Sequence, residues 1–303
     1  MATAIGEIRV TPPPCFQVFA RHFHLGPPSR AIPLPVWYRQ PRGSRLVPPW
    51  RKLKVTFKDL FSTQSSDYAR FRPAYPDALF AWLASVAPER ACAVDVATGN
   101  GQAAAQLAPH FARVVALDAS AAQIAEAPAR ANVQYGVAPA EATGLASGSA
   151  DLLTAAQAFH WFDQPRFFAE AGRLLRPDGV LAVWCYGLTR IEPAVDAIIQ
   201  HLYAEVLGSY WEPERRLVEE GYRGVAFPFQ PLAGPPFEMS ADWDLSDLLG
   251  YLRTWSALKA FVRARGSDPL AGPALDLERA WGGSGRRPVR WPLSVHVTRR
   301  RVT

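Results

Sequence analysis

The sequence contains only three cysteines among its 303 residues, and they lie far apart at Cys15, Cys92 and Cys185. No CxxC pair or Cys/His cluster joins them, which argues against a structural zinc site and against a disulfide framework. No apolar run approaches the roughly 18 to 20 residues that cross a bilayer, and the first residues lack the charged-then-apolar pattern of a secretory signal. These absences predict a soluble protein of the reducing cytoplasm, without a bound metal and without a membrane partner.

The excess of positive charge is confined to the first part of the chain. Residues 1–54 hold nine Lys or Arg against one acidic residue, and ten of the 28 prolines, whereas the remainder holds 24 basic against 26 acidic residues. A nearly neutral remainder attracts phosphate groups weakly, so nucleic acid is not an expected partner.

Dense proline breaks helix and strand periodicity, so we expect residues 1–54 to be a disordered extension. It is either a genuine basic tail or upstream sequence joined by a start site placed too early. The abrupt change in composition favours the second, with Val55 as the true start.

Residues 55–303 show the pattern of an α/β domain with a parallel sheet. The segment 77–86 (DALFAWLASV) spaces its apolar residues as an amphipathic helix. After this helix, strands are expected at 91–96, 114–117, 132–135, 151–156 and 180–184. Further helices are expected at 102–111, 121–131 and 165–175. Beyond them the pattern predicts helices at 193–207 and 245–263, and strands at 236–243 and 289–297 that close the sheet as an antiparallel edge. About residues 188–285 are therefore expected to hold the insertions that cap a substrate site.

The first turn from strand to helix, DVATGNGQ, carries the residues typical of a nucleotide site. Gly99 and Gly101 let the backbone turn tightly and approach a ligand, and Asp95 stands at the carboxyl end of its strand, where open α/β sheets bind ligands. Asp118 follows 23 residues later at the end of the second strand, in a position to accept hydrogen bonds from both ribose hydroxyls. Together the two acids predict a nucleoside that bears an amino-acid ammonium group.

Three alternatives remain open at this point. Gly99, Gly101 and Ala104 also satisfy GxGxxA, so the chain can be a nicotinamide-dependent oxidoreductase, although Asp95 would repel a pyrophosphate. A second alternative is a protein that binds the cofactor, has lost catalysis and acts through partners. In the third, the glycines only form a tight turn.

Several sequence words in a fixed order make the pattern more specific. They are YARFRPAYP at 68–76, DVATGNGQAA at 95–104, LDAS at 117–120, APAEA at 138–142, AQAFHWFD at 156–163, RLLRPDGVLAVW at 173–184 and GYLRTWSA at 250–257. With them the chain resembles the class I S-adenosylmethionine-dependent methyltransferases, in the group that includes relatives of trans-aconitate methyltransferase. The resemblance implies a Rossmann-like, seven-stranded, mostly parallel sheet with an antiparallel edge and helical cap insertions. It also implies S-adenosyl-L-methionine as cofactor and a small-molecule methyl acceptor, with carboxylates as the suggested class. The oligomeric state is not determined.

The resemblance also assigns the cofactor site. Asp95, Ala97 and Gly99 would border the methionine end, with Gly101 in the same cofactor-binding turn. Asp118 would hold the ribose, and Ala119 and Ala140 would flank the adenine, whose amino group Glu141 or a backbone carbonyl would contact. Gln157 and Ala158 would line the inner wall. Two positions depart from the family pattern. Ala97 stands where many members have glycine, and Pro139 stands where many have an acid that contacts adenine.

Three residues are candidates for binding or activating the methyl acceptor. His160 is a general base or orienting donor, or alternatively a side chain that caps the next helix or fills the wall. Tyr68 and Arg72, with Tyr75, would form a lid in which the aromatic rings exclude water and Arg72 holds a carboxylate. The alternative is a packed N-terminal helix with one solvated arginine.

Other arginines are given weaker interpretations. Arg253, beside Tyr251 and Trp255, is a second candidate for an anionic substrate, or else a surface charge on an amphipathic helix. Arg215 and Arg216 are expected to be solvated or ion-paired.

Overall fold

The computed structural model describes residues 36–37 and 73–301. The chain divides into one unit of residues Met1–Leu34 and another of Pro35–Thr303, and all described residues belong to the second. Two residues of the proline-rich segment form strand β1 (Val36–Trp37), which pairs with β4. The rest of residues 1–54 lies outside the described residues, so its predicted disorder stays a prediction.

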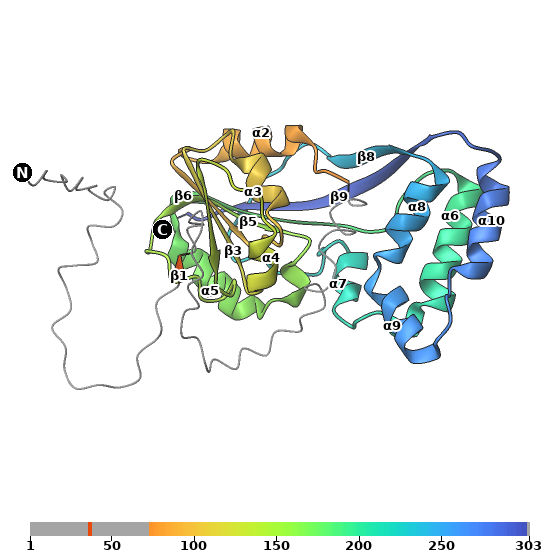
Figure 1. Ribbon diagram of the computed structural model, residues 1–303. Helices are drawn as coiled ribbons and strands as arrows, with labels where there is room; N and C mark the ends of the chain where they lie inside the picture. The colour runs from red at the N-terminus through yellow and green to blue at the C-terminus, as the bar shows by residue number, and fades with distance from the viewer. Residues whose placement is uncertain (1–35, 38–72, 302–303) are drawn as a thin grey trace, which may run out of the picture. The chain divides into compact units, whose positions relative to one another are not determined.

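A sheet with a parallel centre forms the middle of the second unit (Figure 1). Five strands run parallel in the order β4-β3-β2-β5-β6, namely β4 (Val133–Val137), β3 (Arg113–Asp118), β2 (Cys92–Val96), β5 (Ala150–Ala156) and β6 (Leu175–Tyr186). Beyond β6 lies the antiparallel β9 (Arg287–Arg299), followed by β7 (Gln230–Pro231). Strands β2, β3 and β5 and the second part of β6 are almost wholly buried, which is why their sequences are largely apolar runs. This order confirms the predicted Rossmann-like, mostly parallel sheet.

The helices between the strands begin where the sequence predicts and two of them end earlier. Helix α2 (Asp77–Val86) has the predicted bounds. Helices α3 (Gln102–Leu107) and α4 (Ala121–Ala125) stop before 111 and 131. The sequence explains both ends, because Pro109 and Pro128 follow within three residues and proline disfavours helical backbone before it. Helix α5 (Gln164–Leu174) starts at an Asp163 cap and matches the prediction to within one residue.

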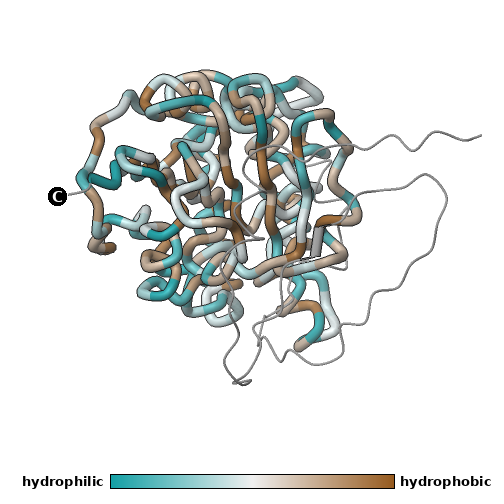
Figure 2. The backbone as a smooth tube through the Cα atoms, turned by 90° about the vertical axis from the view of Figure 1, so that its left-hand side faces the viewer, coloured by the Kyte–Doolittle hydropathy of each residue, from teal (hydrophilic) through white to brown (hydrophobic). Residues whose placement is uncertain are grey.

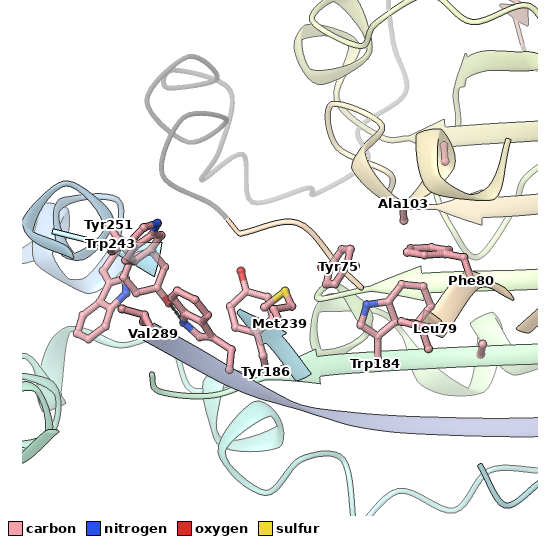
Figure 3. Close-up of a cluster of buried hydrophobic side chains, with 14 of the residues drawn as sticks. Tyr75, Leu79, Phe80, Ala103, Trp184, Tyr186, Met239, Trp243, Tyr251 and Val289 are labelled. Atoms are coloured by element: carbon pink, nitrogen blue, oxygen red, sulfur yellow. Dashed lines mark hydrogen bonds between the residues drawn. The ribbon is translucent and has the colours of Figure 1, made fainter. Parts of the chain in front are cut away.

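Alternation of side chains along β6 divides the core between the two faces of the sheet. Trp184 belongs to the cluster under α2 and α3, and Cys185 belongs to the cluster under α5. In the first cluster Tyr75 and Phe80 pack edge-on against Trp184 (Figure 3). Along the backbone, hydrophobic and hydrophilic stretches alternate (Figure 2). Burial of apolar surface from both sides thus fixes the strands whose ends carry the candidate site.

Helices α6 (Pro193–His201), α8 (Leu245–Arg253), α9 (Ser256–Arg265) and α10 (Ala271–Trp281) gather around the far half of β9 (Figure 1). Strand β9 pairs with β6 through residues 293–299 and with β8 (Glu238–Trp243) through 287–292, so one long strand joins the sheet to this cap. The predicted single helix over 245–263 is wrong. The chain breaks at Thr254, whose hydroxyl bonds to the Tyr251 carbonyl. Within residues 73–301, no helix has both the length and the apolar character needed to cross a bilayer.

Candidate active site

Asp95 anchors the turn between β2 and α3. The side chain is fully buried. Thr98 donates its hydroxyl to Oδ2 of Asp95 at 2.5 Å, and Thr154 of β5 donates to Oδ1 at 2.6 Å. The carboxylate therefore ties the turn to the neighbouring strand. Its predicted contact with an ammonium group stays a prediction.

Burial raises the pKa of Asp95 to about 6, against the opposing effect of the Thr154 and Thr98 hydroxyls, and the nearby Asp118 charge raises it further. An ionised carboxylate in a dry site is a costly group, because low dielectric disfavours the charged form. A cation placed beside the turn would relieve that cost. The electrostatics of the turn therefore favour a positively charged ligand group and disfavour a phosphate.

The turn itself uses left-handed backbone at Ala97 (φ 50°), Gly99 (φ 58°) and Gly101 (φ 85°). Side chains rarely adopt this conformation, which costs about 1–2 kcal/mol for a residue with a Cβ. Glycine, which the family resemblance implies at the position of Ala97, would avoid this strain. Gly101 has a second constraint, because a Cβ there would lie 2.6 Å from the hydroxyl oxygen of Tyr135.

Asp118 lies at the carboxyl end of β3 and faces the same turn. Its Oδ2 accepts the Gly99 amide and its Oδ1 accepts the Ser120 amide, both at 2.8 Å. The two amides fix the orientation of the carboxylate beside the turn. The side chain is 7% exposed, whereas Asp95 is 0% exposed. Of the two carboxylates, that of Asp118 is the less buried.

The predicted adenine contacts lie near Asp118. Ala119 is partly exposed and Ala140 is buried, in the loop that follows β4. Glu141 accepts the Asp163 amide at 3.0 Å, so its carboxylate helps to fix the start of α5. The adenine contact proposed for Glu141 stays a prediction.

Gln157 joins the carboxyl ends of β5 and β6. Its side-chain oxygen accepts a hydrogen bond from the Tyr186 amide at 2.8 Å, and its side-chain nitrogen donates to the Tyr186 carbonyl at 3.2 Å. This pair of hydrogen bonds continues the backbone pairing of β5 and β6 beyond the end of β5. The backbone is left-handed (φ 52°). Ala158 follows, buried. Both residues border the end of the sheet where the cofactor wall was predicted.

His160 lies in the 3-10 helix η2 (Phe159–Trp161) just beyond β5. Its Nδ1 is 2.9 Å from the Tyr222 hydroxyl. Burial lowers the pKa of His160 to about 3, and the positive charge of Arg215 contributes in the same direction. The imidazole is therefore neutral near pH 7 and a weak proton acceptor. This favours an orienting or wall-forming role over that of a general base. Sequence reasoning missed Tyr222, whose segment carries no periodic pattern.

The remaining predicted substrate residues are Tyr68, Arg72, Tyr75 and Arg253. Tyr68 and Arg72 lie outside the described residues, so their lid stays a prediction. Tyr75 is a core residue packed on Trp184. Arg253 pairs with Asp268 at 2.8 Å on the surface, which agrees with the interpretation as a surface charge.

A cavity of about 570 Å³ opens at the carboxyl end of β6. The loop 187–190 forms one wall, α6 and α7 (Arg215–Glu219) form others, and Pro292 and Ser294 of β9 close it. The loop begins one residue after Tyr186, which Gln157 holds. The cavity thus adjoins the end of the sheet that carries the predicted cofactor residues, and its volume suits a small molecule.

The strand order, the acidic turn and the second acid at the end of β3 define the class I fold of S-adenosylmethionine-dependent methyltransferases. Residues 94–183 match the family described as "Methyltransferase domain". A protein of Dictyostelium discoideum assigned to the methyltransferases is 37% identical over 218 residues, covering 71% of this chain and 83% of the relative. A solved structure from Anaeromyxobacter dehalogenans, described as a type II methyltransferase, is 49% identical with a TM-score of 0.72, covering 75% of this chain and 97% of that one. The chain belongs to the methyltransferase family.

Proposed function

We propose that this protein transfers the methyl group of S-adenosyl-L-methionine to a small-molecule acceptor that carries a carboxylate. The observation that carries the cofactor assignment is the pair of buried acids around the left-handed turn. Asp118, which the Gly99 and Ser120 amides orient at the end of β3, would accept hydrogen bonds from the ribose hydroxyls. Asp95, buried below the turn, would act on the ammonium group through its charge and through the turn that it holds. Ala119, Ala140, Gln157 and Ala158 would line the rest of the site.

The cofactor, when bound, supplies a methyl group activated by a sulfonium. The chain then needs to align the acceptor and keep water away, which proximity and desolvation accomplish without a metal. A carboxylate acceptor is already ionised near pH 7, so no base is required. The neutral His160, with its pKa of about 3, supports this choice, because an acceptor that had to lose a proton would need a stronger base. His160 would orient the acceptor.

Calorimetric titration with S-adenosylhomocysteine tests the cofactor site. The double variant Asp95→Asn with Asp118→Asn should lose at least about 100-fold in affinity, because hydrogen bonds to charged groups contribute about 1.5–3 kcal/mol each. Asp276→Asn, which removes an exposed carboxylate paired with Arg279, is the matched control and should bind as the parent does. Unchanged affinity in the double variant would refute the site. Tight binding of NADH alone would favour the oxidoreductase alternative.

Turnover separates an enzyme from a protein that only binds the cofactor. The parent protein, mixed with methyl-labelled S-adenosylmethionine and a panel of small carboxylic acids, should yield a labelled, base-labile ester of at least one acid. Cofactor binding without transfer to any acid, at any pH between 6 and 9, would contradict the proposed acceptor class.

A further inference from the structure

Tyr222 is a buried tyrosine whose hydroxyl meets the ring of His160. Its side chain is 0% exposed, and its hydroxyl oxygen lies 2.9 Å from Nδ1 of His160. Phe159 packs edge-on against the tyrosine ring, with 5.2 Å between the ring centroids. These contacts join the segment after α7 to the 3-10 helix after β5. Tyr222 is therefore a direct neighbour of the candidate residue at the methyl acceptor.

The backbone at Tyr222 is strained. Gly221 and Tyr222 are both left-handed, with φ of 59° and 58°. A left-handed glycine is an ordinary end of a helix, but a left-handed aromatic residue costs free energy. Hydrogen bonds hold the segment in place, because His296 Nε2 donates to the Gly221 carbonyl at 2.6 Å and the Tyr222 amide donates to the Leu217 carbonyl at 2.9 Å. Strain that the surrounding structure enforces is concentrated at functional sites, which favours a functional role for the placement of Tyr222.

The hydrogen bond between Tyr222 and His160 has a preferred direction. Burial raises the pKa of Tyr222 well above its usual value, so the hydroxyl keeps its proton and needs an acceptor for it. Among the described residues, the one nitrogen or oxygen to which this hydroxyl bonds is Nδ1 of His160. Cys185 also lies close to it, but a thiol is a weak acceptor. A buried hydroxyl that donates to no acceptor is unfavourable, so the Tyr222 hydroxyl donates to Nδ1.

This donation fixes the tautomer of His160. The imidazole is neutral near pH 7, because burial lowers its pKa to about 3. A neutral imidazole carries one N–H, so an Nδ1 that accepts leaves the proton on Nε2. Within the described part of the chain Nε2 makes no hydrogen bond, and it is not one of the enclosed polar atoms that lack a partner, such as Trp184 Nε1. Nε2 thus offers one N–H to a ligand.

We propose that Tyr222 is a positioning residue that holds His160 in the Nε2–H tautomer, so that Nε2 donates a hydrogen bond to the carboxylate of the methyl acceptor. This role rests on the proposed function, since it specifies how the same site recognises an anionic acceptor. A carboxylate oxygen only accepts hydrogen bonds, so Nε2 can bind it when protonated and repels it otherwise. Tyr222 acts through His160 and does not touch the acceptor.

Nitrogen-15 NMR of the protein labelled at histidine tests the tautomer. The His160 signals are those that disappear in His160→Asn. At pH 7 the parent should have a protonated Nε2 and an unprotonated Nδ1. In Tyr222→Phe the Nδ1 signal should move toward that of an unbonded ring nitrogen. The matched control is Tyr203→Phe, which should leave both signals unchanged, because the buried Tyr203 hydroxyl bonds to Glu219 at 2.5 Å and to Arg215 at 3.1 Å.

Kinetics with an acid that the parent methylates test the effect on transfer. Tyr222→Phe keeps the ring and should lose about 3-fold to 10-fold in kcat/KM for the acid, the contribution of one hydrogen bond. Its affinity for S-adenosylhomocysteine should match that of the parent. The double variant Tyr222→Phe with His160→Asn should be no slower than His160→Asn alone, because the tyrosine acts through the histidine. Any effect of Tyr203→Phe should instead be the same with and without His160.

Each result decides a separate point. A proton on Nδ1 in the parent, or an equal loss from Tyr222→Phe with and without His160, would overturn the role of Tyr222. Binding of S-adenosylhomocysteine without transfer to any acid would overturn donation to a carboxylate together with the proposed acceptor class. Failure of S-adenosylhomocysteine to bind would overturn the proposed function, while the tautomer would still be decided by NMR. If Tyr222→Phe does not fold, the NMR of the parent decides, because it needs no change at Tyr222.

Discussion

Replacing Asp95 with asparagine should stabilise the fold while it weakens cofactor binding. Burial raises the pKa of this carboxyl from 3.8 to about 6, so the folded protein binds its proton more tightly than the unfolded chain does. The free energy of unfolding therefore falls as the pH rises from about 4 to about 6. A difference of about two pKa units corresponds to roughly 3 kcal/mol at pH 7. The asparagine amide can donate to one of the two threonine hydroxyls and accept from the other. Asp95→Asn should therefore raise the free energy of unfolding at pH 7 by about 1–2 kcal/mol, which is part of that cost.

Urea unfolding at pH 7 and at pH 4.5 measures the effect. The advantage of Asp95→Asn should disappear or reverse at the lower pH, because protonation of the parent carboxyl in the folded state removes about 2 kcal/mol of its penalty. The matched control is Asp151→Asn. Asp151 is equally buried, but it accepts the Ala91 and Cys92 amides and pairs with Arg176 at 2.9 Å. Its loss should destabilise the fold by about 3 kcal/mol. If Asp95→Asn destabilised the protein as Asp151→Asn does, or if its effect did not change with pH, the electrostatic argument would fail.

Three further predictions concern the same region. Ala97→Gly should raise the free energy of unfolding by about 0.5–1 kcal/mol in the same urea assay, because it removes left-handed strain at a smaller cost in unfolded-state entropy. Gly101→Ala should lower it by about 2–3 kcal/mol through its clash with the Tyr135 hydroxyl, and Tyr135→Phe should restore part of the loss. The pH profile of kcat/KM should show no ionisation of His160 between pH 5 and 9; an inflection that disappears in His160→Asn would contradict the low pKa.

The central sheet could be predicted because its signals are local. Continuous apolar runs mark strands that are buried on both faces, and the helix over 77–86 was found with its bounds because Pro76 precedes a clear 3.6-residue period. The errors in α3 and α4 were also local, since Pro109 and Pro128 were already visible in the sequence. The positions of these prolines are sufficient to predict both helix ends.

The cap could not be predicted in the same way, because its structure depends on contacts between distant segments. Helix α10 was missed, and it ends where the Trp281 indole donates to the Gly285 carbonyl and Arg287 stacks on the ring. The partner of His160 is 62 residues away, at Tyr222. Neither pairing leaves a period or a motif in the sequence, so the environment of His160 could only come from the structure.

The two acids of the candidate cofactor site, Asp95 and Asp118, also combine features that local sequence predicts with features that only packing determines. Their spacing identifies both as site residues, yet packing gives them different environments. The Gly99 and Ser120 amides orient Asp118 at the end of β3, whereas Asp95 is enclosed by two threonine hydroxyls. A buried carboxylate that is unfavourable to ionise persists where function needs its charge, since a neutral residue would give a more stable turn. The expected gain in stability and loss of affinity in Asp95→Asn are therefore two consequences of one cause, and they should appear in the same variant.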